Sequence, residues 1–159
     1  MRVGQGFDVH PFSDDPDRRL VLGGVLFDGA RGLAGHSDAD VIAHAVTDAL
    51  LGAAGLGDIG QHFPDTDPAL AGADSIALLR RAVADVRAAG WRPSNVDCTV
   101  VLEAPKLAPQ RDAMQDTLSG AVGAPVTVKG KRAEGLGSLG REEGIACFAV
   151  ALVESEEAR

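Results

Sequence analysis

The sequence predicts an α+β (α/β-like) fold in which helices pack on one face of a mixed β-sheet. Segments with an apolar period of about 3.6 residues, typical of helices, are interspersed with segments of alternating or continuous apolar residues, typical of strands. Their order is β-β-α-α-β-α-β-β, which is typical of a layer of helices on one sheet. The 159 residues suit one domain, expected over residues 1–159, with a core at 1–153 and a solvated tail at 154–159.

Composition and charge narrow the class of protein. Hydrophobic residues make up 45% of the chain and charged residues 24%, which is ordinary for a soluble globular protein. The net charge of -8 argues against nucleic acid or an anionic membrane as the main partner. Because no long uncharged apolar run is present, we expect a cytoplasmic protein without a signal or membrane anchor. Cys98 and Cys147 lie in apolar runs and are expected to be buried free thiols in a reducing compartment.

The first strand is expected at residues 2–10, and Pro11 ends it because proline cannot donate to a strand ladder. Side chains alternate along a strand, so four of these residues share one face: Gly4, Gly6, Asp8 and His10. The glycines clear space on that face. Residues 20–27 form the second expected strand, which the turn at Asp28 and Gly29 ends.

The central helix is expected at residues 35–51, which read GHSDADVIAHAVTDALL, with Ser37 or Asp38 as its N-cap. Its apolar residues form one broad face. Three polar residues are spaced four apart and therefore share the other face: Asp40, His44 and Asp48. We expect the two carboxylates to orient the imidazole.

The remaining elements follow from the same patterns. They are a helix capped by Ser75 and stopped by Gly90, a strand at 95–102, a helix at 110–122, and strands at 126–129 and 145–153. The last strand is almost wholly apolar, so it should be central or buried on both faces. Between the first two helices, residues 52–67 form a long irregular segment, and loops of that length are usually functional or mobile.

Asp8, His10 and His44 form the strongest candidate site. One carboxylate and two imidazoles would leave a fourth tetrahedral position open. An open position is typical of catalytic zinc sites, whereas structural zinc sites are closed by protein ligands. The simpler alternative is a chance Asp-x-His pair with His44 at the edge of the core.

Two loops offer further chemistry. Residues 57–67 carry three carboxylates that could hold sugar hydroxyls or a divalent cation, although a solvated cluster of turn residues is the simpler interpretation. Gly135, Gly137 and Gly140 match G-x-G-x-x-G, but the motif runs into a strand, so we reject a dinucleotide fold. Its backbone N–H groups could instead face phosphate, unless it is only a solvated loop. Cations surround this loop: Lys129, Lys131, Arg132 and Arg141.

Glu134 is the acid within that cationic cluster, and a carboxylate beside cations at a phosphate site suits a bridging Mg²⁺. The segment 103–106, which reads EAPK, could present backbone groups that bind the edge of a nucleobase. The segment 103–106 alone does not identify a nucleotide site.

The chain resembles the 2-C-methyl-D-erythritol 2,4-cyclodiphosphate synthase family of the non-mevalonate isoprenoid pathway. The resembling segments read RVGQGFDVHPF, GHSDADVIAHAVTDALLGAAGLGDIG, FPDTDP, NVDCTVVLEAPKLAP and GLGSLGREEGIAC. They span residues 2 to about 153. The first two segments are the most specific, because metal ligands and flanking glycines match the family in order and spacing.

The resemblance implies a reaction and an assembly. The substrate would be 4-diphosphocytidyl-2-C-methyl-D-erythritol 2-phosphate, whose 2-phosphate attacks the β-phosphorus, displaces CMP and closes a cyclic diphosphate. Such an enzyme is a phosphorus–oxygen lyase. Zinc, or another divalent transition metal, would sit on Asp8, His10 and His44, and Mg²⁺ or Mn²⁺ would bridge the substrate diphosphate near Glu134. The family is a homotrimer with sites between subunits.

The resemblance also implies the residues that contact substrate. His36 and Ser37 match phosphate-contacting positions, and His36 would be catalytic by stabilising the transition state. The methylerythritol-binding positions are Asp58, Ile59, Gly60, Phe63, Pro64, Asp65, Thr66 and Asp67. The cytidine- and phosphate-binding positions are Leu102, Glu103, Ala104, Pro105, Lys106, Leu107, Ala108, Lys131, Arg132, Ala133 and Glu134. Asp8, Val9 and His10 are further contact positions, and Ser138 and Arg141 match positions near the threefold axis.

This chain departs from the family at two places. The family commonly has Thr-Thr-Thr-Glu where residues 131–134 read KRAE, so a phosphate-contacting hydroxyl is replaced by Arg132. We hypothesise that Arg132 neutralises phosphate charge directly and is a catalytic group, since a guanidinium can form bidentate hydrogen bonds to phosphate. The family's common phenylalanine is replaced by Ser138, so the resemblance does not extend to an apolar ligand pocket on the trimer axis.

A second function class remains open at the level of sequence. A metal-stabilised nucleotide-binding protein without turnover would share most of these residues, but it would not need His36 or Glu134. A purely structural zinc domain fits less well, since structural zinc sites are usually closed by four protein ligands.

Overall fold

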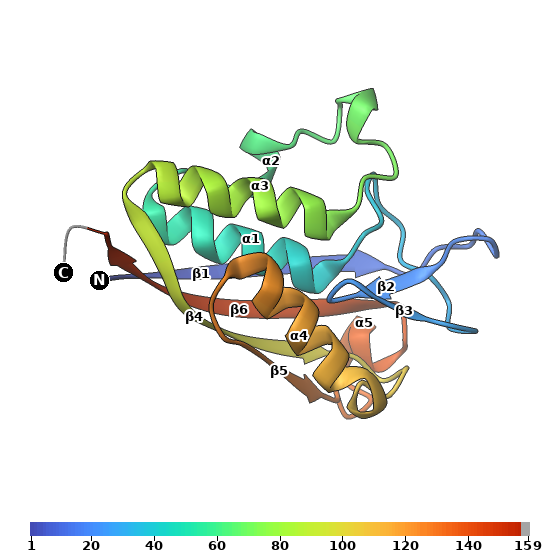
Figure 1. Cartoon of the computed structure of the whole chain (residues 1–159). Helices are drawn as coiled ribbons and strands as arrows, with labels where there is room; N and C mark the ends of the chain where they lie inside the picture. The colour runs from blue at the N-terminus through green and yellow to red at the C-terminus, as the bar shows by residue number, and fades with distance from the viewer. Residues whose placement is uncertain (157–159) are drawn as a thin grey trace.

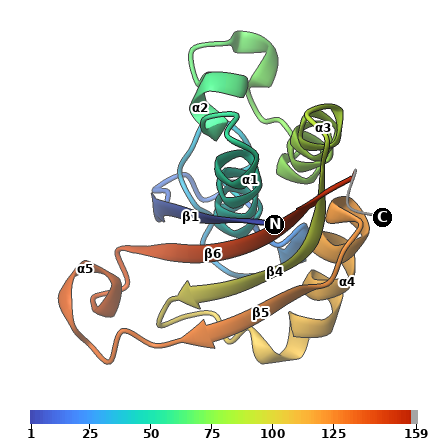
Figure 2. The same cartoon turned by 90° about the vertical axis from the view of Figure 1, so that its left-hand side faces the viewer.

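The computed structural model describes residues 1–156 and has a four-stranded sheet with the order β1-β6-β4-β5. Strand β6 pairs antiparallel with both β1 and β4, whereas β4 and β5 are parallel. Three long helices cover one face of the sheet (Figures 1 and 2). The predicted mixed sheet with helices on one face is therefore confirmed. The sheet strands are β1 (Arg2–Pro11), β4 (Trp91–Val101), β5 (Val126–Lys131) and β6 (Gly144–Ser155).

The three long helices lie in the predicted segments, although α1 begins at residue 41 and not within residues 35–38. The long ones are α1 (Val41–Ala54), α3 (Ser75–Ala88) and α4 (Arg111–Val122). Short helical turns connect them: α2 (Ile59–His62), α5 (Gly137–Gly140), and the 3-10 turns Pro68–Leu70 and Ala108–Gln110. No helix within residues 1–156 is both long and apolar enough to cross a membrane.

Helix α1 lies directly on β1 because β1 carries glycines. A Cβ atom at Gly6 would lie 1.9 Å from the backbone oxygen of Ala45, and one at Gly4 would lie 2.0 Å from that of Ala49. The space that we predicted beside the ligand residues is thus filled by the backbone of α1. The close approach brings the polar side of α1 onto the end of β1.

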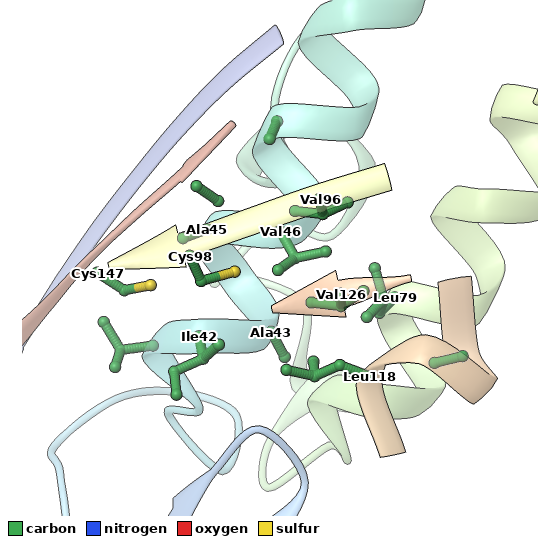
Figure 3. Close-up of a cluster of buried hydrophobic side chains, with 14 of the residues drawn as sticks. Ile42, Ala43, Ala45, Val46, Leu79, Val96, Cys98, Leu118, Val126 and Cys147 are labelled. Carbon is green, nitrogen blue, oxygen red and sulfur yellow. The ribbon is translucent and has the colours of Figure 1, made fainter. Parts of the chain in front are cut away.

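The core lies between the helices and the sheet. Figure 3 shows a cluster of its buried side chains, which includes Ile42, Val46 and Leu79 from the helices. Cys98 and Cys147 are free and buried, as predicted, in the same cluster (Figure 3). One continuous core underlies the whole sheet.

The outer face of the sheet carries exposed apolar residues on β1 and β6 in the single chain. Phe7 and Phe148 pack ring against ring, with centroids 4.8 Å apart, and the Phe148 residue is 45% exposed. Strand β6 is central in the sheet, as predicted, but one of its faces is not buried by this chain. The exposed apolar residues of this face are Val3, Phe7, Val9, Phe148 and Val150.

Several predicted boundaries are wrong, for local reasons. The segment 20–27 is a hairpin of β2 (Leu20–Leu22) and β3 (Val25–Phe27), because Gly23 and Gly24 adopt positive φ angles and form its turn. Helix α3 is capped by Asp74 and not by Ser75. Strand β6 includes residues 154 and 155 of the expected tail, and residues 157–159 lie outside the described part of the chain.

Candidate functional site

Asp8, His10 and His44 meet at one point, as the sequence predicted. The Asp8 Oδ2 atom lies 3.0 Å from His10 Nε2 and 3.0 Å from His44 Nδ1. The two ring nitrogens are 3.3 Å apart. The three side chains therefore form a group that could hold a metal ion, with each residue offering one ligand atom.

Each ligand has a clear structural origin. Asp8 and His10 are two residues apart on β1, so their side chains point to the same face. His44 lies in the first turn of α1, which the β1 glycines hold against the strand. The Nδ1–H of His10 donates to the carbonyl oxygen of Ala34 at 2.7 Å, since a carbonyl can only accept. The Nε2 atom of His10 is thereby the nitrogen that donates to Asp8 when the ring is protonated and that a metal ion would take when the ring is neutral.

The electrostatics favour an ionised carboxylate at this point. Burial opposes ionisation of Asp8, but hydrogen bonds to His10 and His44 and the charges of the two rings outweigh it and hold the pKa of Asp8 well below its ordinary value. Burial lowers the pKa of His10, but the hydrogen bond and charge of Asp8 dominate and raise it. A metal ion binding here would displace the proton from His10 Nε2.

Asp40 and Asp48 do not orient His44, so that prediction is wrong. Helix α1 begins at Val41, and Asp40 is its N-cap, accepting from the N–H groups of Ile42 and Ala43. Asp40 also accepts from the hairpin turn at residues 23 and 24, and burial raises its pKa against these hydrogen bonds. The Asp48 carboxylate instead accepts from Ile59 N–H at 2.7 Å, and burial raises its pKa.

His44 is instead held on its other side by two serines. Its Nε2 atom lies 2.8 Å from Ser75 Oγ and 3.1 Å from Ser37 Oγ. Ser75 in turn donates to Asp38. Sequence reasoning assigned Ser75 and Asp38 only to helix caps. Their spacing from a candidate ligand gave no signal, because Ser75 lies 31 residues from His44 along the chain.

A cavity of about 400 Å³ opens beside the three ligands. Nine of its lining residues were predicted contact or ligand positions, and the sequence did not single out Leu70 and Leu78. The predicted residues that line it are Asp8, His10, His36, Ser37, His44, Ile59, Gly60, Phe63 and Asp65. Pro64, Thr66, Asp58 and Asp67 belong to the same loop but do not line the cavity; Asp58 caps α2 and accepts from Gln61 N–H.

The loop that carries His36 is fixed from both sides. His36 Nε2–H donates to the backbone oxygen of Asp67 at 2.8 Å. Arg18 donates to three backbone oxygens of the segment, those of Leu33 at 2.9 Å, Gly35 at 3.2 Å and Ser37. Nothing in the residue pattern selects Arg18, because it lies in a polar loop with several charges.

The predicted cytidine- and phosphate-binding positions surround a second cavity, of about 230 Å³. Arg132 pairs with Glu103 at its rim, with Nη2 2.8 Å from the carboxylate, and Gly135 N–H donates to the same carboxylate. The Gly135 hydrogen bond and Arg132 hold the pKa of Glu103 below its ordinary value. The predicted residues that line this cavity are Leu102, Glu103, Pro105, Lys106, Leu107, Ala108, Lys131 and Arg132.

The other predicted positions lie around these cavities. Ala104 and Glu142 line a separate surface hollow. Val9, His10 and Ser138 line another hollow. Arg141 pairs with Glu143 at 2.6 Å. Ala133 and Glu134 follow the end of β5; Glu134 has a φ of 54°, a region that non-glycine residues rarely adopt and that recurs at functional sites.

The two cavities lie at opposite edges of the sheet. Asp8 and His10 of β1 line the ligand cavity, whereas Gly130 and Lys131 of β5 line the second cavity. Strands β1 and β5 are the two edge strands of the sheet (Figure 2). The two cavities share no lining residue. One chain therefore does not bring all the predicted contact residues together.

The fold and the site define a small α+β protein with an Asp/His/His centre for a metal ion, open to a cavity. The YgbB family model matches residues 1–154. The chain belongs to the YgbB family, which confirms the resemblance seen in the sequence.

Three relatives are similar to this chain over almost their whole length. The 2-C-methyl-D-erythritol 2,4-cyclodiphosphate synthase of Bordetella petrii is 60% identical over 156 residues, which cover 96% of this chain and 95% of that protein. A solved 2C-methyl-D-erythritol-2,4-cyclodiphosphate synthase with bound CDP has a TM-score of 0.86 and 39% identity, covering 96% of this chain and all of that one. The CDP complex of IspF from Plasmodium falciparum has a TM-score of 0.83 and 33% identity. The match covers 98% of this chain and 96% of that one.

Proposed function

We propose that this protein converts 4-diphosphocytidyl-2-C-methyl-D-erythritol 2-phosphate to 2-C-methyl-D-erythritol 2,4-cyclodiphosphate and CMP. A 2-phosphate oxygen attacks the β-phosphorus, and the bond from that phosphorus to the bridging oxygen breaks, so the oxygen leaves with CMP. The reaction is that of a phosphorus–oxygen lyase. The observation that carries the proposal is the convergence of Asp8, His10 and His44 beside a cavity, in a chain whose relatives carry this synthase's name.

The ligand set fits zinc or another divalent transition metal. Imidazole nitrogens and carboxylate oxygens are both common ligands of zinc, and three protein ligands leave one position for substrate. A bound zinc ion would act as a Lewis acid toward a substrate phosphate oxygen. A second cation, Mg²⁺ or Mn²⁺, would accompany the substrate diphosphate near Glu134.

The protein's own task in such a reaction is mainly to position the two phosphates. Intramolecular attack needs the phosphate groups clamped in line, and good orientation contributes roughly 7–11 kcal/mol. His36 lines the cavity and is fixed through the backbone oxygen of Asp67, so it can stabilise charge that develops on phosphate. Arg132, 70% exposed on its side chain, would contribute positive charge from the second cavity.

We also propose that the protein is a homotrimer with its sites between subunits. Two observations support this. The contact residues are divided between opposite edges of the sheet, so a neighbouring copy is needed to join the two cavities. The outer face of the sheet carries an apolar surface that includes Phe7, Phe148 and Val150, and such surfaces usually mark interfaces. The experiment is light scattering of the wild-type protein and of Phe148→Asp, which should lower the mass to that of one chain.

The reaction itself is tested directly. Purified protein is incubated with the cytidine diphosphate substrate and Mg²⁺, and products are followed by phosphorus NMR and chromatography. We expect free CMP and a cyclic diphosphate in equal amounts. Binding of substrate without CMP release would favour the alternative, a nucleotide-binding protein without turnover, and would overturn the proposal. We further expect the protein in the cytoplasm, with a small molecule as its ligand and neither nucleic acid nor a membrane as its partner.

A further inference from the structure

We infer that Arg81 and Asp85, two side chains of α3, are positioning residues that hold one wall of the ligand cavity in place. The wall is the segment 59–70, which contains α2 and part of the loop that follows it. Neither residue lines the cavity, and the sequence pattern singles out neither. The inference deepens the proposed function and rests on it, because the wall contains the proposed methylerythritol-binding positions.

The wall stands out from the layer of long helices, between α1 and α3 in the chain (Figures 1 and 2). Both of its ends are anchored by hydrogen bonds. The Ile59 N–H donates to Asp48 on α1 at 2.7 Å, and the backbone oxygen of Asp67 accepts from His36 at 2.8 Å. The stretch between these anchors needs support of its own. The wall residues that line the cavity are Ile59, Gly60, Phe63, Asp65 and Leu70.

Helix α3 supplies this support from one of its sides. Leu78, Arg81 and Asp85 are spaced three and four residues apart, so they share one face of the helix. Leu78 lines the cavity itself. The guanidinium carbon of Arg81 lies 4.9 Å from the centre of the Phe63 ring, and Asp85 Oδ2 lies 3.4 Å from His62 Nδ1. Consecutive wall residues thus meet consecutive turns of α3, and we call these two pairs the α3 clamp.

The first pair of the clamp joins a cation to an aromatic ring. A guanidinium is attracted to the negative face of such a ring. Phe63 is 8% exposed and lines the cavity, so a shift of its ring changes the shape of the cavity. No carboxylate among residues 1–156 pairs with Arg81, so no ion pair draws its charge away from Phe63.

The second pair depends on the charge of His62. The Nε2–H of this ring donates to the backbone oxygen of Leu56 at 2.9 Å, since a carbonyl only accepts. A carboxylate also only accepts, so the contact with Asp85 needs a second N–H on Nδ1 and is an ion pair of the protonated ring. No other carboxylate of residues 1–156 lies within 4.0 Å of the ring nitrogens, and Arg81, one turn away, opposes protonation. This pair therefore strengthens as the pH falls.

The experiment first measures the wall in the full-length protein without substrate. Amide hydrogen exchange, followed by mass spectrometry and corrected for intrinsic rates, reports the local opening of residues 59–70. Arg81→Ala and Asp85→Ala should each speed exchange of the wall about 2- to 5-fold, and the double variant roughly 10-fold. The effect of Asp85→Ala should be larger at about pH 6 than at about pH 8, because histidine changes charge in this range.

Three further variants separate the clamp from a general effect on α3. Arg80→Ala is the matched control, because Arg80 is exposed on the same helix and has no hydrogen bond, ion pair or ring contact with residues 1–156. Arg81→Lys keeps a charge over the ring and should recover part of the protection. Asp85→Asn should recover protection at both pH values, because an amide accepts from the protonated ring and donates to the neutral one. Thermal melts monitor folding.

Steady-state kinetics gives the second readout. In the proposed function, the wall contacts the methylerythritol part of the substrate and not the reacting phosphates. Loss of the clamp should therefore raise KM about 2- to 5-fold and leave kcat within about twofold, since binding shared by substrate and transition state is lost. Zinc affinity should stay unchanged, because neither Arg81 nor Asp85 contacts a member of the metal-ligand group.

Three outcomes would overturn the inference. They are wall exchange in the double variant equal to that of Arg80→Ala, equal losses in Arg81→Ala and Arg81→Lys, or a lower kcat with an unchanged KM in the double variant. The exchange measurement does not require turnover. Faster wall exchange in the clamp variants of a protein that releases no CMP would contradict the proposed function and leave the clamp intact.

Discussion

The ligand cavity and the second cavity differ in how firmly their polar groups are held. The side chains of His44, His10 and Asp8 are 12%, 18% and 24% exposed, and each is fixed by at least two polar contacts. At the second cavity, the Arg132 side chain is 70% exposed and its hydrogen-bond partner is one carboxylate, Glu103. A single chain therefore fixes the metal-ligand group Asp8, His10 and His44, which we call the metal side of the proposed site. It fixes Arg132 and Glu103, which we call the rim, only in part.

The difference indicates which part of the proposed reaction would depend on the proposed trimer. Ligand geometry must be accurate to fractions of an ångström, and buried hydrogen bonds provide that accuracy within one chain. Charge on a surface rim becomes effective only when water is excluded, since exposed ion pairs contribute little. We expect the rim to gain its function when a neighbouring subunit covers it, and the following variants separate the two regions.

The largest effect is expected for His44→Ala. It removes one of three ligands, so zinc affinity should fall by more than about 100-fold, beyond the 10- to 100-fold typical of losing a group that only orients a ligand. CMP release should be lost with it. The measurement is zinc competition together with a CMP assay, each with and without added chelator. Full CMP release by metal-free His44→Ala protein would refute the role of the metal site.

Gly6→Ala should break the contact that carries His44 to β1. The new Cβ atom would lie 1.9 Å from the Ala45 backbone oxygen, so helix and strand must separate, at a cost of about 1–3 kcal/mol or more in unfolding free energy. Gly52→Ala, on α1, is the control, because nothing lies within 4 Å of its new Cβ atom. It should stabilise the protein by about 0.5–1 kcal/mol. Urea unfolding of both variants checks this, and equal stabilities would contradict it.

The metal side could be predicted from the sequence because its signals are periodic. Asp8 and His10 follow from strand alternation, and His44 follows from the polar side of an amphipathic helix. The prediction failed where a helix boundary mattered. Ser37 or Asp38 was expected as the N-cap, but the helix begins at Val41, so Asp40 is the N-cap and not a partner for His44.

Other features of the site could not be predicted because they depend on tertiary contacts. Arg18 reaches backbone oxygens of residues 33–37, and a backbone oxygen leaves no trace in the sequence. Ser75 reaches His44 only because α1 and α3 pack together. The pairing of Arg132 with Glu103 likewise joins two loops that follow different strands. Residue type at a given position carries no information about such partners.

Arg18→Met tests whether the ligand cavity is positioned by its backbone contacts. The variant keeps an apolar stem but loses the donors to Leu33, Gly35 and Ser37, so the loop that carries His36 should shift. Misplacement of this kind should lower kcat by about 10- to 100-fold with a smaller change in KM. Arg31→Met is the control, since Arg31 pairs with Asp14 on the surface. A kcat equal to that of the control would argue against the positioning role.

Arg132→Ala should have the smallest effect and act on the rim alone. The Nε and Nη2 side of the guanidinium faces Glu103, which leaves the Nη1 edge to face a phosphate. Losing that charge-assisted contact should raise KM about 10-fold and leave zinc affinity unchanged. Arg132→Lys should recover part of the loss, because it keeps the charge but not the fork.

If Arg132 binds phosphate directly, Glu103→Gln should change KM in the direction opposite to Arg132→Ala. The variant removes a negative charge from the rim and releases the guanidinium from its partner, so KM should fall. If Arg132 only braces the loop through Glu103, both Arg132→Ala and Glu103→Gln should raise KM, because each breaks the same brace. Steady-state kinetics of the two variants at one salt concentration therefore separates direct phosphate binding from a structural role. Unchanged KM and kcat in Arg132→Ala would exclude both roles.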